Sequence, residues 1–169
     1  MDESTFQSFY ERTKKTLWLY VANMVKDHAL ADDIFQEAYI KFLQSAVEHS
    51  DQVKMKSYLY RIATNLMHDH WRRTKRERKW QEHEEGQTTG NKNAADLRHD
   101  VSEAFGHLSP QQRSLLWLAY AEGYEHKEIA TMLKLREKSI KVLLFRAKQK
   151  LTAIFKQMGI TSEVGNVSN

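Results

Sequence analysis

SYLYRIATNLMHDHWRRTKRERKW, residues 57–80, decides the fold of this 169-residue chain. Its apolar side chains recur every three or four residues, which predicts a helix over about residues 55–78. The apolar face consists of Tyr58, Leu59, Ile62 and Leu66. The helix ends in a dense basic block of Arg72, Arg73, Lys75, Arg76, Arg78 and Lys79. This block fits a polyanionic partner, although a solvated helix end would look the same.

The rest of the chain is also predicted to be helical. It holds one proline and six glycines, and apolar residues recur at steps of three and four. Ser4 with Gln7 fits a capping box, and Asp27 can cap a second helix. Ser109 with Pro110 and Gln112 marks the start of another helix. The C-terminal helices are expected at about 110–122, 125–133 and 137–157.

These elements group into two small helical domains, so the fold class is all-α. Residues 1–80 are predicted to form the first domain and residues 105–158 the second. Between them, residues 81–96 carry no apolar side chain larger than alanine, which predicts a flexible linker over residues 81–104. Residues 159–169 are expected to be a frayed tail.

Composition excludes several classes of protein. The chain has no cysteine, no apolar run of about 20 residues and no signal-peptide pattern, so a cytoplasmic protein is expected. His68 and His70 lie two apart on a helix and face different ways, which argues against a metal site. No nucleophile motif, phosphate loop or glycine-rich fingerprint occurs. We therefore expect no metal, no cofactor and no catalytic site.

Residues 123–151 match the spacing of a helix-turn-helix. Ala130 is small enough for two helices to cross closely, and Leu133 and Ile140 would fix the second helix. That helix would expose a mainly cationic face, made of Lys138, Ser139, Lys141, Val142, Arg146 and Lys148. A plain helical hairpin with a polar outer face is the alternative, but this face favours duplex DNA.

Two positions of this motif fit poorly. Lys134 occupies the turn position usually held by glycine, which costs ~1 kcal/mol if the residue is left-handed. Arg136 is a weak cap for the second helix. Even so, two DNA-contacting segments in one chain predict a protein that reads two sites at once, as promoter recognition requires.

Three stretches resemble the extracytoplasmic-function sigma factors, the short two-domain branch of the sigma-70 family. ALADDIFQEAYIKFL resembles the polymerase-binding helix of that family, and MKSYLYRIATNLMHDHWRR resembles its promoter-melting helix. LSPQQRSLLWLAYAEGYEHKEIATMLKLREKSIKVLLFRAKQKL resembles its C-terminal helix-turn-helix. The three occur in the order and spacing of the family. The resemblance implies a specificity subunit of RNA polymerase, the enzyme itself being the polymerase.

The resemblance implies a role for each surface. The polymerase-binding face would consist of Asp32, Asp33, Gln36, Glu37 and Lys41. By residue chemistry alone it could be a solvated acidic face with a Glu37–Lys41 pair. The partners implied are core RNA polymerase, through the clamp helices of its largest subunit and its flap region, promoter DNA and an anti-sigma factor.

The promoter-melting helix carries a polar stripe at steps of four, four, three and four: Arg61, Asn65, Asp69, Arg72 and Arg76. An amide can read base edges, arginines follow phosphates, and Tyr58 and Trp71 offer stacking surfaces unless they are core residues. By resemblance this stripe, with Arg73, would capture the melted minus-ten strand. The preceding loop, with His49, Ser50 and Asp51, would hold a flipped base.

The helix-turn-helix would bind the minus-thirty-five element through its exposed face and Lys127. Leu143 departs from the family, which often has arginine at this position. The sequence preference at the minus-thirty-five element is therefore the property that can least be inferred for this chain from the family. Two alternatives remain at this point: a stand-alone helix-turn-helix regulator of duplex operators, and a helical interaction module. The region between the domains resembles a segment that threads toward the polymerase cleft, but a passive tether would have the same composition.

Overall fold

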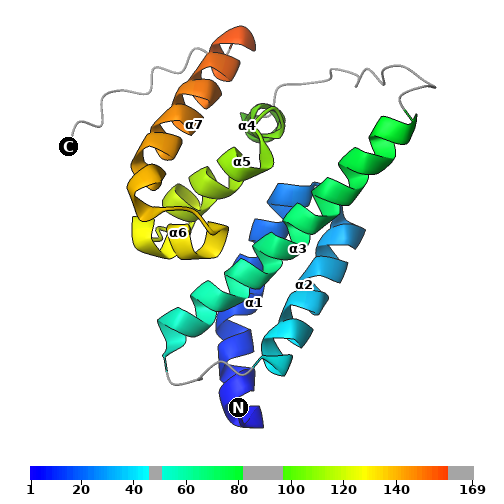
Figure 1. The fold of residues 1–169 in the computed structure, drawn as a ribbon, viewed down its shortest axis with the longest axis vertical. Coiled ribbons are helices and arrows are strands. Elements are labelled where there is room, and N and C mark those ends of the chain that lie inside the picture. The colour runs from blue at the N-terminus through cyan, green and yellow to red at the C-terminus, as the bar shows by residue number, and fades with distance from the viewer. Residues whose placement is uncertain (46–50, 82–96, 160–169) are drawn as a thin grey trace.

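The computed structural model describes residues 1–45, 51–81 and 97–159. Within these residues every element is helical, which confirms the all-α prediction. The first three helices form one unit, with α1 at Glu3–Val25, α2 at His28–Gln44 and α3 at Gln52–Gln81. The remaining helices form a second unit, which packs against α3 mainly through α6 (Figure 1). They are α4 (Leu97–Gly106), α5 (Pro110–Leu116), the π-helical turn η1 (Trp117–Ala121), α6 (His126–Leu133) and α7 (Glu137–Gln157).

The first residues of the helices show which of the predicted capping residues form capping hydrogen bonds. Asp27 caps α2 by accepting from the Leu30 N–H at 3.0 Å, as predicted. Ser109 and Gln112 form both hydrogen bonds of the predicted capping box. The predicted Ser4 cap is wrong, because the Asp2 carboxylate instead accepts from the Thr5 N–H at 2.7 Å. A carboxylate just upstream of Ser4 binds the free N–H groups of the first turn, so α1 begins sooner.

Helix α3 also begins earlier than predicted. Asp51 accepts from the backbone N–H groups of Val53 at 2.9 Å and Lys54 at 3.3 Å, so α3 starts at Gln52. The Asp51 carboxylate, predicted to contact DNA, therefore caps a helix. His49 and Ser50 of the same predicted loop lie outside the described residues.

The second unit begins inside the range predicted as linker. Helix α4 starts at Leu97, and Ala104 on it is fully buried. The linker prediction therefore extended too far at its C-terminal end. The composition of the predicted linker did not reveal α4, because the few apolar residues of this helix follow directly on the polar stretch. Residues 82–96, like the end of the predicted tail, lie outside the described residues.

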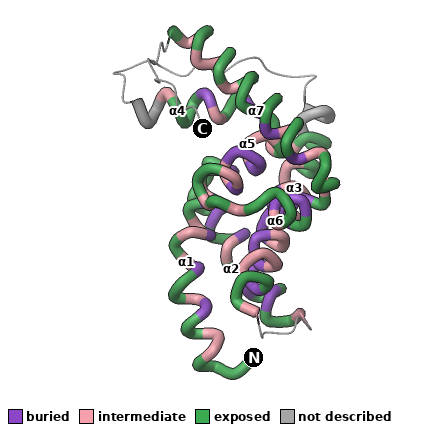
Figure 2. The backbone as a smooth tube through the Cα atoms, turned by 90° about the vertical axis from the view of Figure 1, so that its left-hand side faces the viewer, coloured by how far each residue is buried: buried purple, intermediate pink, exposed green. Residues whose placement is uncertain are grey.

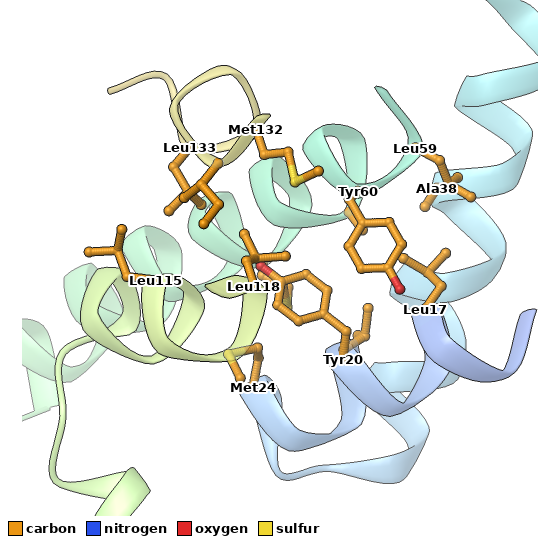
Figure 3. Close-up of a cluster of buried hydrophobic side chains, with 14 of the residues drawn as sticks. Leu17, Tyr20, Met24, Ala38, Leu59, Tyr60, Leu115, Leu118, Met132 and Leu133 are labelled. Carbon is orange, nitrogen blue, oxygen red and sulfur yellow. The ribbon is translucent and has the colours of Figure 1, made fainter. Parts of the chain in front are cut away.

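One buried core runs through both units. Figure 3 shows Tyr20 and Met24 of α1 and Tyr60 of α3 beside Leu118, where the two units meet. Figure 2 shows buried positions on α5 and α6 as well as on the first three helices. Besides the predicted Leu59, helix α3 buries Met55, Tyr60, Ala63 and Met67, whereas Tyr58, Ile62 and Leu66 are only partly buried. The predicted apolar face was too narrow because α3 contacts the second unit as well as α1 and α2.

Candidate nucleic-acid interface

A polar cluster around Glu122 joins the two units. The Tyr60 hydroxyl of α3 donates to Glu122 Oε1 at 3.1 Å, and Lys56 Nζ lies 3.7 Å from Glu122 Oε2. The side chain of Glu122 is only 8% exposed. Lys56 also lies over the rings of Tyr60 and Tyr124, 5.6 and 5.2 Å from their centroids. Burial raises the pKa of Tyr60, so its hydroxyl remains a proton donor to Glu122.

A second cluster surrounds Arg113 of α5. Its Nη1 donates to the Met24 carbonyl at the end of α1 at 3.0 Å. The guanidinium lies 5.2 Å from the Trp71 ring centroid of α3, a cation–π contact. Arg113 therefore ties α5 to both α1 and α3. Burial lowers its pKa, because the charged guanidinium is less well solvated between the two units than in water.

The predicted stripe on α3 exists as one surface of the helix, but it is covered unevenly. Arg61, Asn65 and Asp69 are partly buried, whereas Arg72 and Arg76 are exposed. Arg73 is also exposed. The Asp69 carboxylate accepts a hydrogen bond from Arg72, which leaves the stripe with a net positive charge. An amide between guanidinium groups can bind base edges and phosphates together.

Two grooves between α3 and the second unit account for the partial burial. One groove is lined by Asn65, His68, Trp71, Arg72 and Lys75 of α3 and by Ser109, Pro110, Gln111, Leu133 and Lys134 opposite them. The other is lined by Val53, Lys54, Ser57, Tyr58 and Arg61 of α3 and by Lys127, Glu128 and Thr131 of α6. The structure thus brings Lys127, predicted to serve the minus-thirty-five element, beside Arg61, predicted to serve the minus-ten element.

The two aromatic candidates for base stacking already have partners. Tyr58 is partly buried, with its ring centroid 6.2 Å from that of Phe42 in the first unit. Trp71 packs against the Arg113 guanidinium and lies 5.5 Å from the His68 ring. Tyr58 is therefore largely a packing residue, and one side of Trp71 contacts the second unit.

His68 is a polar group that the junction leaves without a partner. Its Nε2 is buried and makes no hydrogen bond within the described part of the chain. Burial lowers the pKa of His68, and the positive charge of Arg72 lowers it further. The neutral ring is therefore the form that fits this groove.

The predicted polymerase-binding residues lie together on the exposed side of α2. Asp32, Asp33, Gln36, Glu37 and Lys41 are all exposed. Asp32 accepts from Trp18 Nε1 of α1 at 2.7 Å, and Lys41 lies 3.4 Å from Glu37. The sequence reasoning missed Ile40 and Leu43, which are 54% and 48% exposed on the same side of the helix. Their spacing from Gln36 and Glu37 was the signal that could have found them.

Helix α7 has the position expected for the second helix of a helix-turn-helix. Lys134 does adopt the left-handed conformation, with φ 54° and its N–H bonded to the Ala130 carbonyl. Arg136 precedes α7 without a side-chain cap hydrogen bond, in agreement with its description as a weak cap. Lys138, Lys141, Val142, Arg146 and Lys148 are exposed, whereas Ser139 and Leu143 are partly buried. Phe145, which the sequence reasoning left out, is 60% exposed.

Residues 1–45, 51–81 and 97–159 contain no group of three or more potential metal-ligating side chains.

Among the same described residues, no helix is both long enough and apolar enough to cross a membrane.

Family models match both units in order. The model described as Sigma-70 region 2 matches residues 9–77, and the model described as Sigma-70, region 4 matches residues 98–151. The first contains the α2 face and nearly all of α3. The second contains the helix-turn-helix and the outward face of α7.

Relatives and solved structures agree with these matches. The chain is 24% identical to the ECF RNA polymerase sigma factor SigM of Bacillus subtilis, over 94% of this chain and 99% of that protein. It is 26% identical to the ECF sigma factor SigL of Mycobacterium tuberculosis, over 95% of this chain and 94% of SigL.

Its fold resembles RpoE of Bartonella quintana, solved with the anti-sigma factor NepR, at a TM-score of 0.73 and 22% identity, covering 89% of this chain and 96% of RpoE. CnrH, solved with the cytosolic domain of CnrY, gives a TM-score of 0.68 and 19% identity over 92% and 90% of the two chains. Region 2 and region 4 are both present, and the two curated relatives, which match over nearly their whole length, are both ECF sigma factors. This chain therefore belongs to the extracytoplasmic-function group of the sigma-70 family and is an RNA polymerase sigma factor.

Proposed function

We propose that this sigma factor reads a promoter with two separate surfaces while α2 holds it on core RNA polymerase. The single observation that carries the proposal is the stripe on α3, where Asn65 lies between guanidinium groups in the region 2 match. A stand-alone duplex regulator needs the helix-turn-helix but has no use for such a surface. The chain would act in the cytoplasm as a specificity subunit, with the polymerase supplying catalysis.

The α2 face supports polymerase docking through its mixture of charge and exposed apolar surface. Asp33, Gln36 and Glu37 offer acidic and amide groups, and Ile40 and Leu43 add aliphatic surface beside them. Interface centres combine apolar side chains with a polar rim in this way. We assign this face to the clamp helices of the largest polymerase subunit, and a surface of the second unit to the flap region.

The α3 stripe supports binding of the melted minus-ten strand. Asn65 would hydrogen-bond a base edge, while Arg61, Arg72, Arg73 and Arg76 would follow the phosphates. Asp69 would hold Arg72 in position. His49 and Ser50, which precede this helix in the sequence, are assigned to the flipped base. Asp51, which caps α3, would fix the end of that loop.

The exposed side of α7 supports binding of the duplex minus-thirty-five element. Lys138, Lys141, Arg146 and Lys148 would contact phosphates on either side of a major groove. Ser139 is partly buried near the start of α7 and would contact the backbone at most. Lys127 is exposed and lines the groove against α3, so the neighbouring α3 restricts the directions from which duplex DNA could approach it.

The two units must separate on a promoter. The two elements lie roughly 25 base pairs apart, which at 3.4 Å per pair is on the order of 80 Å of duplex. In this structure α6 packs directly on α3, and α7 packs on α6. Two helix diameters, on the order of 20 Å, then separate the two DNA-binding surfaces. The arrangement seen is therefore a closed form, and promoter binding would require an open form.

An anti-sigma factor is the further partner that we assign. RpoE was solved with the anti-sigma factor NepR. A protein that bound both units of this chain would stabilise the closed form, because only in that form are the two units adjacent.

The proposal is tested by reconstitution. The purified chain should bind core RNA polymerase and direct transcription from promoters captured with the holoenzyme. Asp33→Lys combined with Glu37→Lys should weaken holoenzyme formation without loss of helicity, because neither side chain is buried. Glu3→Lys combined with Glu11→Lys on α1 is the matched control and should bind normally. Unchanged polymerase binding by the α2 variant would contradict the docking assignment.

A further inference from the structure

The outward side of α7 presents an apolar pair that the protein core does not use. Val142 is 49% exposed and Phe145 is 60% exposed. The core side of the helix is formed instead by the buried Ile140, Leu144 and Ala147. At 100° per residue, Val142 and Phe145 point away from that core side. Folding of this chain therefore gives no reason for a phenylalanine at this position.

The apolar pair lies in the middle of a cationic surface. Lys138, Val142, Phe145 and Gln149 follow each other at steps of four, three and four, so they form one outward row. Lys141 and Lys148 lie on one side of this row, and Arg146 and Lys150 lie on the other. All four cations are exposed. Such a surface has the form expected of a helix that lies between two phosphate backbones.

The apolar groove of the second unit is a different surface. It is lined by Phe105, Leu116, Trp117, Tyr120, Ala121, Lys148 and Leu151, and includes neither Val142 nor Phe145. Its aromatic Tyr120 is covered by Lys148, whose Nζ lies 4.4 Å from the ring centroid. The apolar pair thus stands apart from this groove, with cations on both of its sides. Charge complementarity favours duplex DNA over a protein as its occupant.

Only one chemical group of the major groove matches an apolar side chain. Each base pair offers hydrogen-bond donors and acceptors there, and thymine alone adds a C5-methyl group. Val142 and Phe145 are the sixth and ninth residues of α7, within the part of a recognition helix that enters the groove. Packing against thymine methyls would remove both the methyls and the exposed ring from water.

We propose that Val142 and Phe145 are specificity-determining residues that read thymine methyl groups in the upstream promoter element. The inference rests on the proposed function, because it requires α7 to enter duplex DNA. It goes beyond that function by naming the base feature that is read.

The test replaces thymine by deoxyuridine, which lacks only the methyl group. Holoenzyme containing the full chain would be titrated with a captured promoter duplex, with deoxyuridine placed singly at each thymine of the upstream element. Burial of one methyl corresponds to a factor of about four in affinity. We expect at least one position where wild-type holoenzyme binds about four-fold more weakly.

Variants then assign the effect to the side chains. Phe145→Ala holoenzyme should bind thymine and deoxyuridine duplexes equally at that position. Because Phe145 is exposed and alanine is a stronger helix former, the variant should keep its fold, checked by circular dichroism. Lys150→Ala is the matched control on the same helix: it should weaken both duplexes alike and keep the four-fold difference. Val142→Ala repeats the test without loss of an aromatic ring.

The outcomes separate this inference from the proposed function. If wild-type holoenzyme protects the upstream duplex but ignores every methyl group, the inference is wrong and the proposed function stands. If no upstream duplex is bound at all, both are wrong. If Phe145→Ala keeps the methyl effect but loses affinity for core polymerase, the side chain binds protein and the inference is overturned.

Discussion

The two helices proposed to bind DNA, α3 and α7, differ in how exposed their proposed DNA-binding faces are in the closed form. The reading face of α3 lies against the second unit, so Arg61 and Asn65 are partly buried in grooves shared with α5 and α6. The reading face of α7 is turned outward, and its Lys141, Val142 and Phe145 are exposed. On the proposed assignment, the closed form therefore partly covers the surface for single-stranded DNA and leaves the surface for duplex DNA accessible. Opening should therefore control promoter melting more than duplex binding.

The largest effect is expected from removing the amide on α3. Asn65→Ala should reduce promoter opening by holoenzyme by about 1–3 kcal/mol, since the variant cannot form a bidentate hydrogen bond to a base edge. Permanganate reactivity of the melted region measures this directly. Asn23→Ala on α1, whose exposed amide donates to the Leu19 carbonyl of its own helix, is the matched control. Normal opening by Asn65→Ala would remove α3 as the base reader.

Weakening the contact between the two units should expose α3 without any substitution on α3 itself. Glu122→Ala leaves the Tyr60 hydroxyl without its acceptor and Lys56 without its ion pair. Hydrogen bonds to charged groups contribute about 1.5–3 kcal/mol, so the closed form should lose stability by that order. The chain has no cysteine, so dyes on Lys15→Cys and Lys150→Cys would report separation by energy transfer.

The control for this experiment is Glu11→Ala, which breaks only exposed contacts within α1, to Lys14 and Gln7. It should leave the dye separation unchanged. If Glu122→Ala also leaves the separation unchanged, the polar cluster does not hold the two units together.

A smaller effect is expected from removing exposed cations of α7. Arg146→Ala and Lys148→Ala should each weaken upstream duplex binding across sequences, because long cations bind phosphates. Each variant should flatten the plot of log affinity against log salt by about 0.9 for every phosphate that it no longer neutralises. Salt titrations of duplex binding by holoenzyme measure the slope. A change in sequence preference at constant slope would instead make these residues base readers.

The smallest effect is expected in the pH dependence of the unfolding free energy, through His68. Burial lowers its pKa in the folded chain below 6.5, the ordinary value, so the unfolded chain takes up the proton first. The stability contributed by the neutral ring is complete above about pH 6.5 and is lost as pH falls from there through the lower pKa of the folded chain. His68→Gln should therefore show a flatter decline in unfolding free energy between about pH 7 and pH 5, measured by urea titration. An equal slope in both proteins would contradict the buried neutral ring.

Local signals in the sequence were sufficient for most helices and for the polar stripe. Asp27 and the Ser109–Gln112 box cap helices as their chemistry requires, and the steps between Arg61, Asn65 and Asp69 place them on one side of α3. These are interactions within one or two turns. They depend on residue type and spacing alone, so a single sequence reveals them.

Features that depend on packing between distant segments could not be predicted. Tyr60 is fully buried because α3 meets a second unit, and nothing in the spacing around Tyr60 indicates that meeting. Asp2 displaces Ser4 as a cap because two suitable residues compete for the N–H groups of the first turn. Phe145 was overlooked because an aromatic residue at helical spacing is usually assigned to a core.

The most direct test would lock the closed form and release it again. Ser57→Cys and Thr131→Cys place thiols on opposite sides of one groove, in a chain without other cysteines. A reducible bismaleimide would join them, and each single variant treated with the same reagent is the control. Polymerase binding through α2 and permanganate reactivity of the promoter would be measured before and after reduction.

If the closed form withholds α3, the linked chain should bind core polymerase through the exposed α2 face but leave the minus-ten region unmelted. Reduction of the linker should restore melting, and the single variants should melt the promoter throughout. Melting by the linked chain equal to that of the reduced chain would contradict the claim that α3 is withheld in the closed form.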